Sequence, residues 1–321
     1  MPRAYRTDMH YDLDGKLVTL FGGGGFIGRY AAQQLLARGA RVRVVQRNPA
    51  AAMFLKPLGN LGQSQFVAAD VRSAASVARA MAGSDAVVNL VGSFANMDAV
   101  QHRGAANIAA AAGDQGIGRL VHVSAIGADV ASPAVYGRSK GEGEAAVRAA
   151  VPNAVILRPS TVFGREDQFI NRFAGMIRLA PIVPLVAPAA RFQPVYVGDV
   201  ASAIVAALDD PAAGRTFELG GPQILSMDDL FRWIAHAIGR HPRFLSVPDA
   251  ATAMLARLTG WAPGAPLTWD QWLMLQKDTV VAPGADALAD LGITATALDT
   301  VAHEWLVKYR SHGRFGLTKR M

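Results

Sequence analysis

The segment Leu17-Val18-Thr19-Leu20-Phe21-Gly22-Gly23-Gly24-Gly25-Phe26-Ile27-Gly28 sets the architecture of this chain. Its apolar first half predicts a buried strand over Leu17 to Phe21. Behind the glycines the pattern predicts a helix over Phe26 to Arg38, closed by Gly39, a residue suited to the left-handed backbone that ends many helices. The chain therefore begins its fold with a strand, a tight turn and a helix.

Three glycines of this turn stand at spacings of three: Gly22, Gly25 and Gly28. We expect Gly22 to permit the sharp turn, Gly25 to let a pyrophosphate approach the backbone, and Gly28 to bring the helix close to the sheet. The first amides of the helix, with Phe26 and Ile27, would face the phosphates, which the helix dipole favours. The pattern predicts a dinucleotide site, and a glycine-rich turn without a ligand is the alternative.

The same rhythm continues outward from this turn. Short runs rich in Val and Leu alternate with longer helix-like segments as far as Leu157, which is typical of repeated βα units and a parallel sheet. The expected strands are Leu17–Phe21, Arg41–Val45, Gln65–Ala69, Ala86–Val91, Leu120–Ser124 and Ala154–Leu157. We expect an α/β fold of the Rossmann type, with a doubly wound parallel sheet.

A smaller lobe is expected to follow. The segment Pro181 to Pro194 must be loop or short strand because of its prolines, and Val195 to Leu208 should return to the core. A turn cluster at residues 220–222 precedes Ser226 and Asp229, a pattern typical of a helix start. We therefore expect an NADP(H)-binding Rossmann domain over residues 1–222, with its core at 16–208. A C-terminal α/β lobe over 223–321 would face a partner or substrate.

The end of the second strand bears on the choice of nucleotide. Folds that prefer NAD place a carboxylate there for the ribose 2′-hydroxyl, whereas this chain has Gln46-Arg47-Asn48. Arg47 suits a 2′-phosphate, so NADP(H) is favoured and NAD(H) is the alternative. An exposed surface arginine without this role is the other interpretation.

Two further strand ends should line the cofactor trough, because ligands bind outside the carboxyl ends of parallel strands. Asp70 and Val71 follow the third strand, where an adenine would lie. Asp70 serves equally well as the cap of a helix beginning near Ser73, and the sequence leaves both roles open. Val91 and Gly92 follow the fourth strand and are expected beside the cofactor.

A serine, a tyrosine and a lysine form the candidate catalytic group. Ser124 ends the fifth strand, and Tyr136 and Lys140 lie four residues apart on one face of the helix expected next. A nearby ammonium would lower the pKa of Tyr136 from about 10 and make it a general acid or base beside a nicotinamide. Lys140 would also hydrogen-bond the ribose.

The chain resembles the short-chain dehydrogenase/reductase superfamily in its extended and atypical branches. The resemblance rests on Gly22 to Gly28, Asp70-Val71, Ser124, Tyr136 to Lys140 and Arg158-Pro159-Ser160, and it covers roughly the first half of the chain. It implies that Pro159 and Ser160 border the cofactor. One departure concerns the hydroxyl-rich stretch that usually follows the fifth strand, because here Ala125 and Ile126 follow Ser124. Two interpretations of Tyr136 and Lys140 follow: they bind the cofactor without chemistry, in which case Ser124 is vestigial, or they take part in catalysis.

A closer similarity involves Arg158 to Phe173, Gln193 to Val200 and Asp290 to Ile293. These segments are similar to the NADPH-binding Rossmann-type accessory subunits of respiratory complex I and their bacterial relatives, along most of the chain. This resemblance implies a tightly held NADP(H) with a structural role and other complex I subunits as partners. It also implies a peripheral place on the cytoplasmic side of the inner membrane, with a soluble cytoplasmic protein as the alternative.

The amino-acid composition excludes several kinds of site and partner. With 32 Lys and Arg against 25 Asp and Glu, the net charge of +7 favours anionic partners, or else a solvated basic surface. The absence of cysteine excludes disulfides, thiolate catalysis and cysteine-held metals, and no metal site is expected. The basic residues are scattered and no nucleic-acid module accompanies them, so nucleic acid is not expected. Met1 to Lys16 has no signal-peptide pattern and no apolar run is long enough for a bilayer span.

The C-terminal lobe carries the candidate contact surface. Its apolar residues Met254, Leu258, Trp261, Trp269 and Trp272 suit either an amphipathic surface for a partner or membrane, or an ordinary core. The basic tail suits acidic protein or anionic lipid, with a solvated terminus as the alternative. Its members are Lys308, Arg310, Arg314, Lys319 and Arg320.

Three functions follow as hypotheses. The first is a non-catalytic or weakly catalytic NADP(H)-binding accessory subunit that docks through its C-terminal lobe. The second is a free-standing NADP-dependent reductase, epimerase or dehydratase that uses Tyr136 and Lys140. The third is a sensor of the NADP(H) redox ratio that binds a partner differently in each state.

Overall fold

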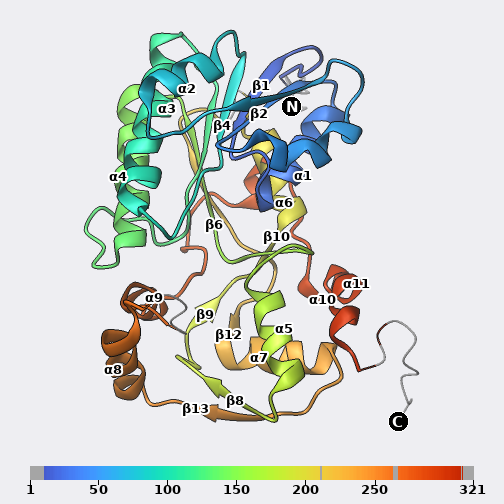
Figure 1. The fold of residues 1–321 in the computed structure, drawn as a ribbon, viewed down its shortest axis with the longest axis vertical. Helices are drawn as coiled ribbons and strands as arrows, with labels where there is room; N and C mark the ends of the chain where they lie inside the picture. The colour runs from blue at the N-terminus through green and yellow to red at the C-terminus, as the bar shows by residue number, and fades with distance from the viewer. Residues whose placement is uncertain (1–10, 210–211, 263–266, 312, 314–321) are drawn as a thin grey trace, which may run out of the picture.

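The computed structural model describes residues 11–209, 212–262, 267–311 and 313, which form two lobes (Figure 1). In the described part of the chain, the upper lobe holds a 7-stranded sheet in the order β11-β6-β5-β4-β1-β2-β3. Every neighbouring pair in this sheet is parallel. The strands are β1 Leu17–Phe21, β2 Arg41–Gln46, β3 Ser64–Ala68, β4 Ala86–Asn89, β5 Leu120–Val123, β6 Val155–Pro159 and β11 Thr216–Leu219. The predicted Rossmann-type α/β fold is confirmed.

Helices cover both faces of the sheet because the central strands bury every side chain, whichever face it occupies. One face packs against α1 and α6 and the other against α2, α3 and α4. The helices are α1 Phe26–Ala37, α2 Ala74–Met81, α3 Arg103–Asp114, α4 Val135–Ala150 and α6 Val197–Ala206. Gly39 follows α1 at a φ of +83°, as expected for a helix-ending glycine.

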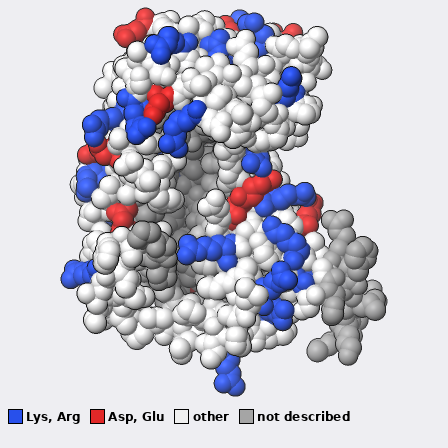
Figure 2. All heavy atoms as spheres, viewed as in Figure 1, with Lys and Arg blue, Asp and Glu red and all other residues white. Residues whose placement is uncertain are grey.

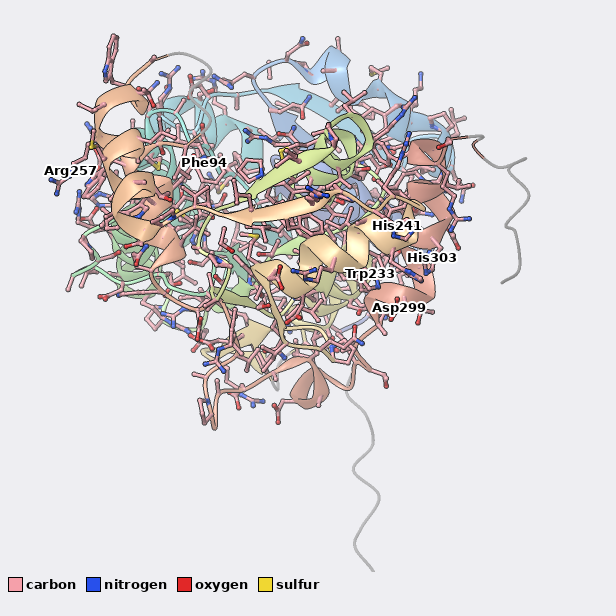
Figure 3. All side chains as sticks on the ribbon, turned by 90° about the horizontal axis from the view of Figure 1, so that it is seen from below. Phe94, Trp233, His241, Arg257, Asp299 and His303 are labelled. Carbon is pink, nitrogen blue, oxygen red and sulfur yellow. The ribbon has the colours of Figure 1, made fainter. Side chains whose placement is uncertain are left out.

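The lower lobe has its own core of aliphatic and aromatic side chains, in which the rings of Phe173 and Phe231 lie 4.4 Å apart between centroids. Ser226 and Asp229 form the expected capping box at the start of α7. Trp233 donates to Asp299 at 2.6 Å and so ties α7 to α10 (Figure 3). The main elements are α5 Ile170–Leu179, β8 Ile182–Leu185, β9 Arg191–Phe192, β12 Leu225–Ser226, α7 Met227–Ala237, β13 Arg243–Ser246, α8 Asp249–Thr259, α9 Trp269–Leu275, α10 Leu298–Val301 and α11 His303–Leu306.

The two lobes exchange segments of chain. Residues 170–192 leave the sheet domain and pack in the lower core, and the chain after α9 climbs back to the sheet. There Asp286 bridges to Phe217 of β11, and Thr296 donates its amide and hydroxyl to the buried Asp199. The expected division at residue 222 therefore does not coincide with a boundary between the two cores.

Several helices and strands of the structure were not predicted from the sequence pattern. The edge strand β11 completes the sheet, although the sequence pattern predicted no strand at these residues. A π-helical turn, η2 Asp98–His102, leads into α3, and a 3-10 segment, η1 Pro49–Leu58, follows β2. These elements are short or lie in alanine-rich sequence, where hydrophobic period is a weak guide.

Candidate functional site

The carboxyl ends of the sheet strands face the lower lobe, and the surface is hollowed between the two lobes (Figure 2). The glycine turn, Asp70, Gly92, Ser124 and Tyr136 all follow strands or begin helices at this edge. An open α/β sheet binds its ligands here because the strand order reverses beside β1. The fold thus gathers most of the expected site residues at one edge.

The glycine turn is shaped by backbone contacts. Gly22 has a φ of +81° and donates its amide to Val45 at 2.8 Å. A Cβ added to Gly28 would lie 2.6 Å from the carbonyl oxygens of Gly22 and Gly23, which only a glycine avoids. Gly25 is exposed, so a ligand has access to the backbone at the start of α1.

Phe26 and Ile27, the two residues between Gly25 and Gly28, contact different parts of the fold. The ring of Phe26 packs beside Gly164, where a Cβ would approach it to 3.1 Å. Ile27 packs against the sheet core. Phe26 therefore contacts the segment around Gly164, whereas Ile27 supports the turn from the core.

The carboxyl ends of β2 and β3 present charged groups. Arg47 is exposed. Arg72 lowers the pKa of Asp70 to about 2 by hydrogen bonding, with a smaller contribution from the charge of Arg47. The helix after β3 is capped by Ser73, whose hydroxyl accepts from the Ser76 amide at 3.3 Å. The capping role considered for Asp70 is therefore wrong, because Asp70 binds Arg72 instead.

Lys140 and Ser124 are buried beneath the cleft. The Lys140 ammonium donates to the carbonyl of Val123 at 3.2 Å, and a Cβ on Gly92 would lie 3.8 Å from its Nζ. Burial lowers the pKa of Lys140 to about 8, against an opposing effect of Glu144. Within the described residues the buried Ser124 hydroxyl has no hydrogen-bond partner. An unpaired buried hydroxyl is costly, so this atom suits a ligand polar group.

Tyr136 is half-buried in the first turn of α4, and its ring stacks on Phe94 at 5.1 Å between centroids. Burial raises the pKa of Tyr136 to about 12. The expected lowering of this pKa by Lys140 is wrong, because the ammonium points to Val123 and desolvation dominates. Near neutral pH Tyr136 is a protonated phenol that can donate a hydrogen bond.

The remaining residues that were expected to bind the cofactor make contacts within the protein. The Ser160 hydroxyl donates to the carbonyl of Thr279 at 2.6 Å and so holds the returning C-terminal segment. Pro159 ends β6 and is buried beside it. Val71 packs against Gly104 of α3, and Val91 packs partly against the sheet core.

Sequence reasoning missed a buried polar pair behind the site. Asn89 of β4 and His122 of β5 are register partners, and their side chains meet at 3.0 Å between Nδ2 and Nδ1. Burial, with a smaller effect of the Lys140 charge, lowers the pKa of His122 to about 3. A signal was present, since each is a polar residue inside a strand whose neighbours are all apolar.

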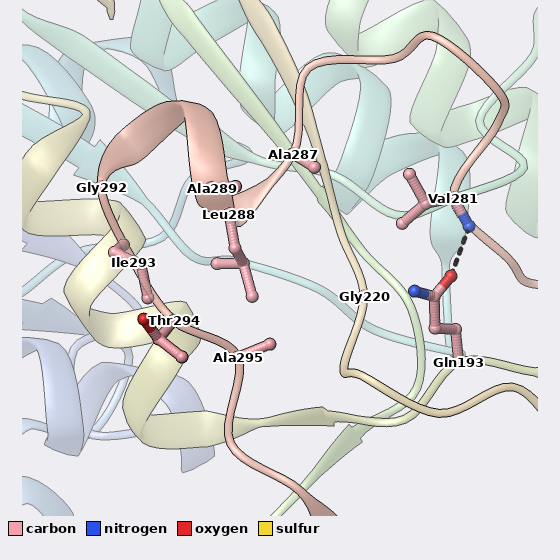
Figure 4. Close-up of a pocket in the computed structure, with 10 residues that line it drawn as sticks. All are labelled: Gln193, Gly220, Val281, Ala287, Leu288, Ala289, Gly292, Ile293, Thr294 and Ala295. Carbon is pink, nitrogen blue, oxygen red and sulfur yellow. Dashed lines mark hydrogen bonds between the residues drawn. The ribbon is translucent and has the colours of Figure 1, made fainter.

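Two other features lie apart from this group. A groove of about 470 Å³ runs between the returning segment and the sheet edge, where Gln193 accepts the amide of Val281 (Figure 4). Its lining contains none of the expected site residues. Asp98, His102 and Glu142 bring possible metal-ligand atoms within 4.8 Å of one another, but Arg103 already binds Asp98 at 2.9 Å.

The apolar residues of the C-terminal lobe form a surface. Met254, Leu258 and Trp261 are 64%, 62% and 83% exposed. Trp269 and Trp272 are half-buried and stack at 4.5 Å, so the alternative of an ordinary core is wrong for this group. In the basic tail, Arg310 donates to the carbonyl of Ala237, whereas Arg314, Lys319 and Arg320 lie outside the described residues. No helix in the described ranges is both long and apolar enough to cross a membrane.

Comparison with known proteins agrees with this geometry. The family model described as "NAD dependent epimerase/dehydratase family" matches residues 18–220. Similar proteins include NADH dehydrogenase (ubiquinone) 1 alpha subcomplex subunit 9, mitochondrial, of Arabidopsis thaliana, which is 35% identical over 95% of this chain and 81% of that protein. The Mus musculus protein of the same name is 34% identical over 94% of this chain and 82% of that protein.

A similar solved structure is that of an NADPH-dependent quinone oxidoreductase from Escherichia coli. Its TM-score is 0.70 at 19% identity, over 90% of this chain and 99% of that one, which supports the fold. The chain therefore belongs to the NAD dependent epimerase/dehydratase family, in the branch that includes the subunit 9 proteins.

Proposed function

We propose that this protein is an accessory subunit of respiratory complex I that holds NADP(H) for a structural or assembly role and has little or no catalysis of its own. The observation that carries the proposal is the similarity to the subunit 9 proteins, which extends through both lobes and not only through the glycine turn. Family membership alone would leave a free-standing enzyme equally favoured.

The site fits a nicotinamide dinucleotide that is held firmly. The turn over Gly22–Gly28 exposes backbone at the start of α1, and Ser124 offers an unpaired buried hydroxyl. Lys140 is placed to bind a ribose hydroxyl, and Tyr136 to donate a hydrogen bond at the nicotinamide end. When bound, the nicotinamide supplies hydride chemistry. At neutral pH this chain supplies a protonated Tyr136, which is a hydrogen-bond donor, rather than a tyrosinate.

The choice of NADP(H) over NAD(H) rests on Arg47, and it gives a direct prediction. Because a guanidinium binds a phosphate by charge-assisted hydrogen bonds, Arg47→Ala should weaken NADPH binding about tenfold. NADH affinity should change by less than about twofold, since NADH has no 2′-phosphate. Fluorescence titration with each nucleotide measures both values.

Arg41→Ala is the matched control, because Arg41 is exposed at the opposite end of the same strand. It should leave both affinities unchanged. An equal loss for NADPH and NADH in Arg47→Ala would contradict the assigned role.

The exposed apolar residues on α8, together with Trp261, are the surface through which we infer that the lobe docks. Arg257 lies over the Trp269 ring at 4.3 Å and faces outward from α8 (Figure 3). An apolar patch with a cation at its rim suits another subunit of the complex or an anionic membrane surface. The proposed place is peripheral, on the cytoplasmic side of the inner membrane.

The test of this function is co-migration. The protein is tagged at its N-terminus, membranes are solubilised gently, and native gels with mass spectrometry follow both the tag and NADH:ubiquinone oxidoreductase. We expect them to travel together, with NADP(H) released on denaturation. Recovery only as a separate, nucleotide-loaded species would overturn the proposal in favour of a free-standing enzyme.

The free-standing reductase, epimerase or dehydratase remains the second candidate because Ser124 follows β5 and Tyr136 and Lys140 lie on α4, which begins at the same edge of the sheet. The variant Tyr136→Phe separates the two functions. We expect its NADPH affinity to fall by no more than about tenfold, the loss of the one hydrogen bond that the Tyr136 hydroxyl would donate to the nucleotide. If the wild type turns over a carbonyl substrate and Tyr136→Phe does not, catalysis is established. Our proposal predicts instead that the wild type itself shows no turnover.

A further inference from the structure

The helix that carries Tyr136 and Lys140 does not cap itself. Its N-cap residue is Ala134, which has no side-chain hydrogen bond to offer, and its first turn contains no acidic residue. The first amides of a helix have no partner inside the helix, so they need an acceptor from elsewhere. The positions of both side chains at the nucleotide site depend on how this end of α4 is held.

The acceptor comes from the other lobe. The Asp270 carboxylate accepts the amide of Tyr136 at 3.2 Å through Oδ2 and that of Val135 through Oδ1. Asp270 belongs to α9, so more than a hundred residues of chain separate it from the helix it caps. An anion at this place also meets the positive end of the α4 dipole.

Asp270 is itself fixed within the α8 and α9 pair. Thr268 and Gln271 form a capping box at the start of α9. Trp272 donates its indole N–H to Asp249 of α8 at 3.1 Å, and Gln276 donates to the same oxygen at 3.3 Å. The pair that bears the exposed apolar surface is thus internally braced, and Asp270 links it to the Tyr136 helix.

We propose that Asp270 is a positioning residue for the nucleotide site and couples NADP(H) affinity to the seating of the α8 and α9 pair against α4. This inference rests on the proposed nucleotide binding. A nucleotide that binds Tyr136 and Lys140 favours the ordered start of α4, and that start favours a seated Asp270. Such coupling is reciprocal, so a partner that holds the pair in place strengthens nucleotide binding by the same factor.

The first measurement is the NADPH dissociation constant of the full chain by fluorescence titration. Loss of an N-cap acceptor destabilises a helix enough for Asp270→Ala to raise the constant about three- to thirtyfold. Asp228→Ala is the control, because it removes a carboxylate of the same lobe that pairs with Arg232 at the surface of α7. It should leave the constant unchanged.

A second variant separates capping from the link between lobes. Ala134→Ser in the Asp270→Ala background supplies a cap within α4 and should restore most of the NADPH affinity. Hydrogen exchange of the backbone amides then measures whether nucleotide binding at α4 also affects α9. In the wild type, NADPH should slow exchange in α9 as well as α4. In both Asp270→Ala proteins the slowing in α9 should be absent, including the one whose affinity is restored.

The outcomes distinguish the two proposals. No NADPH binding by the wild type overturns the proposed function and this inference with it. Wild-type binding with the same constant in a folded Asp270→Ala protein overturns the inference alone, as does NADPH protection of α9 that survives the substitution. If Asp270→Ala does not fold, Asp270→Asn replaces it. This variant keeps one acceptor, and its constant should rise less than tenfold.

Discussion

Gly28→Ala should weaken NADPH binding by roughly 100-fold, about 2.8 kcal/mol, the largest loss of affinity we expect from a single methyl group in this chain. The new Cβ would lie 2.6 Å from two backbone carbonyl oxygens and 2.7 Å from the carbonyl carbon of Gly23. Backbone cannot swing aside as a side chain does, so α1 must move away from the turn. The amides that would meet the pyrophosphate then lose their positions.

The same substitution should lower the free energy of unfolding by about 1–3 kcal/mol, the usual effect of overpacking. Calorimetry and NADPH titration measure the two effects separately. Gly118→Ala is the control, because a Cβ at Gly118 meets nothing within 4 Å. Wild-type affinity in Gly28→Ala would show that the nucleotide does not bind at this turn.

The second large effect is a loss of stability in acid caused by His122. The pKa of His122 is lowered to about 3 in the fold, whereas an unfolded histidine has a pKa of about 6.5. Between these values the unfolded chain binds a proton that the folded chain refuses. The stability is therefore fully present above pH 6.5 and falls through this window, by at most about 1.4 kcal/mol per pH unit from this group.

Urea unfolding at pH 7, 6 and 5 tests this expectation. His122→Gln keeps an amide for Asn89 but removes the titration, so its stability should fall less between pH 7 and 5 than that of the wild type. His236→Gln, at an exposed position of α7, should fall as steeply as the wild type. Equal slopes for all three proteins would mean that another group governs the acid response.

The sequence predicted the sheet well because its signals are local. Each central strand is a short apolar run buried on both faces, and the turn at Gly22 requires a positive φ that glycine supplies. The six expected strands all exist, with ends that differ by at most two residues. The capping box at Ser226 was predictable for the same reason, since its two members lie three residues apart.

The parts that were missed depend on contacts between distant residues. Nothing near Asp270 in the sequence indicates that it caps α4, because its partners lie in another lobe. The pKa of Tyr136 was expected to fall because spacing alone places Lys140 on its face of the helix. The Lys140 ammonium instead binds the carbonyl of Val123, a contact that the spacing of residues along the helix does not show. The seventh strand was missed because polar Thr216 and Glu218 alternate with its two apolar residues, so it lacks the apolar run that marks β4.

The exchange of segments between the lobes has a consequence for synthesis on the ribosome. The glycine turn and the first five strands emerge early and can pair at once. The lower core, however, is closed by Trp305 and Leu306, and β11 meets Asp286 only late in translation. A nascent chain thus exposes the rings around Phe173 and Phe231 until nearly the whole protein has been made. During that interval we expect it to need a chaperone, even though its nucleotide turn is already formed.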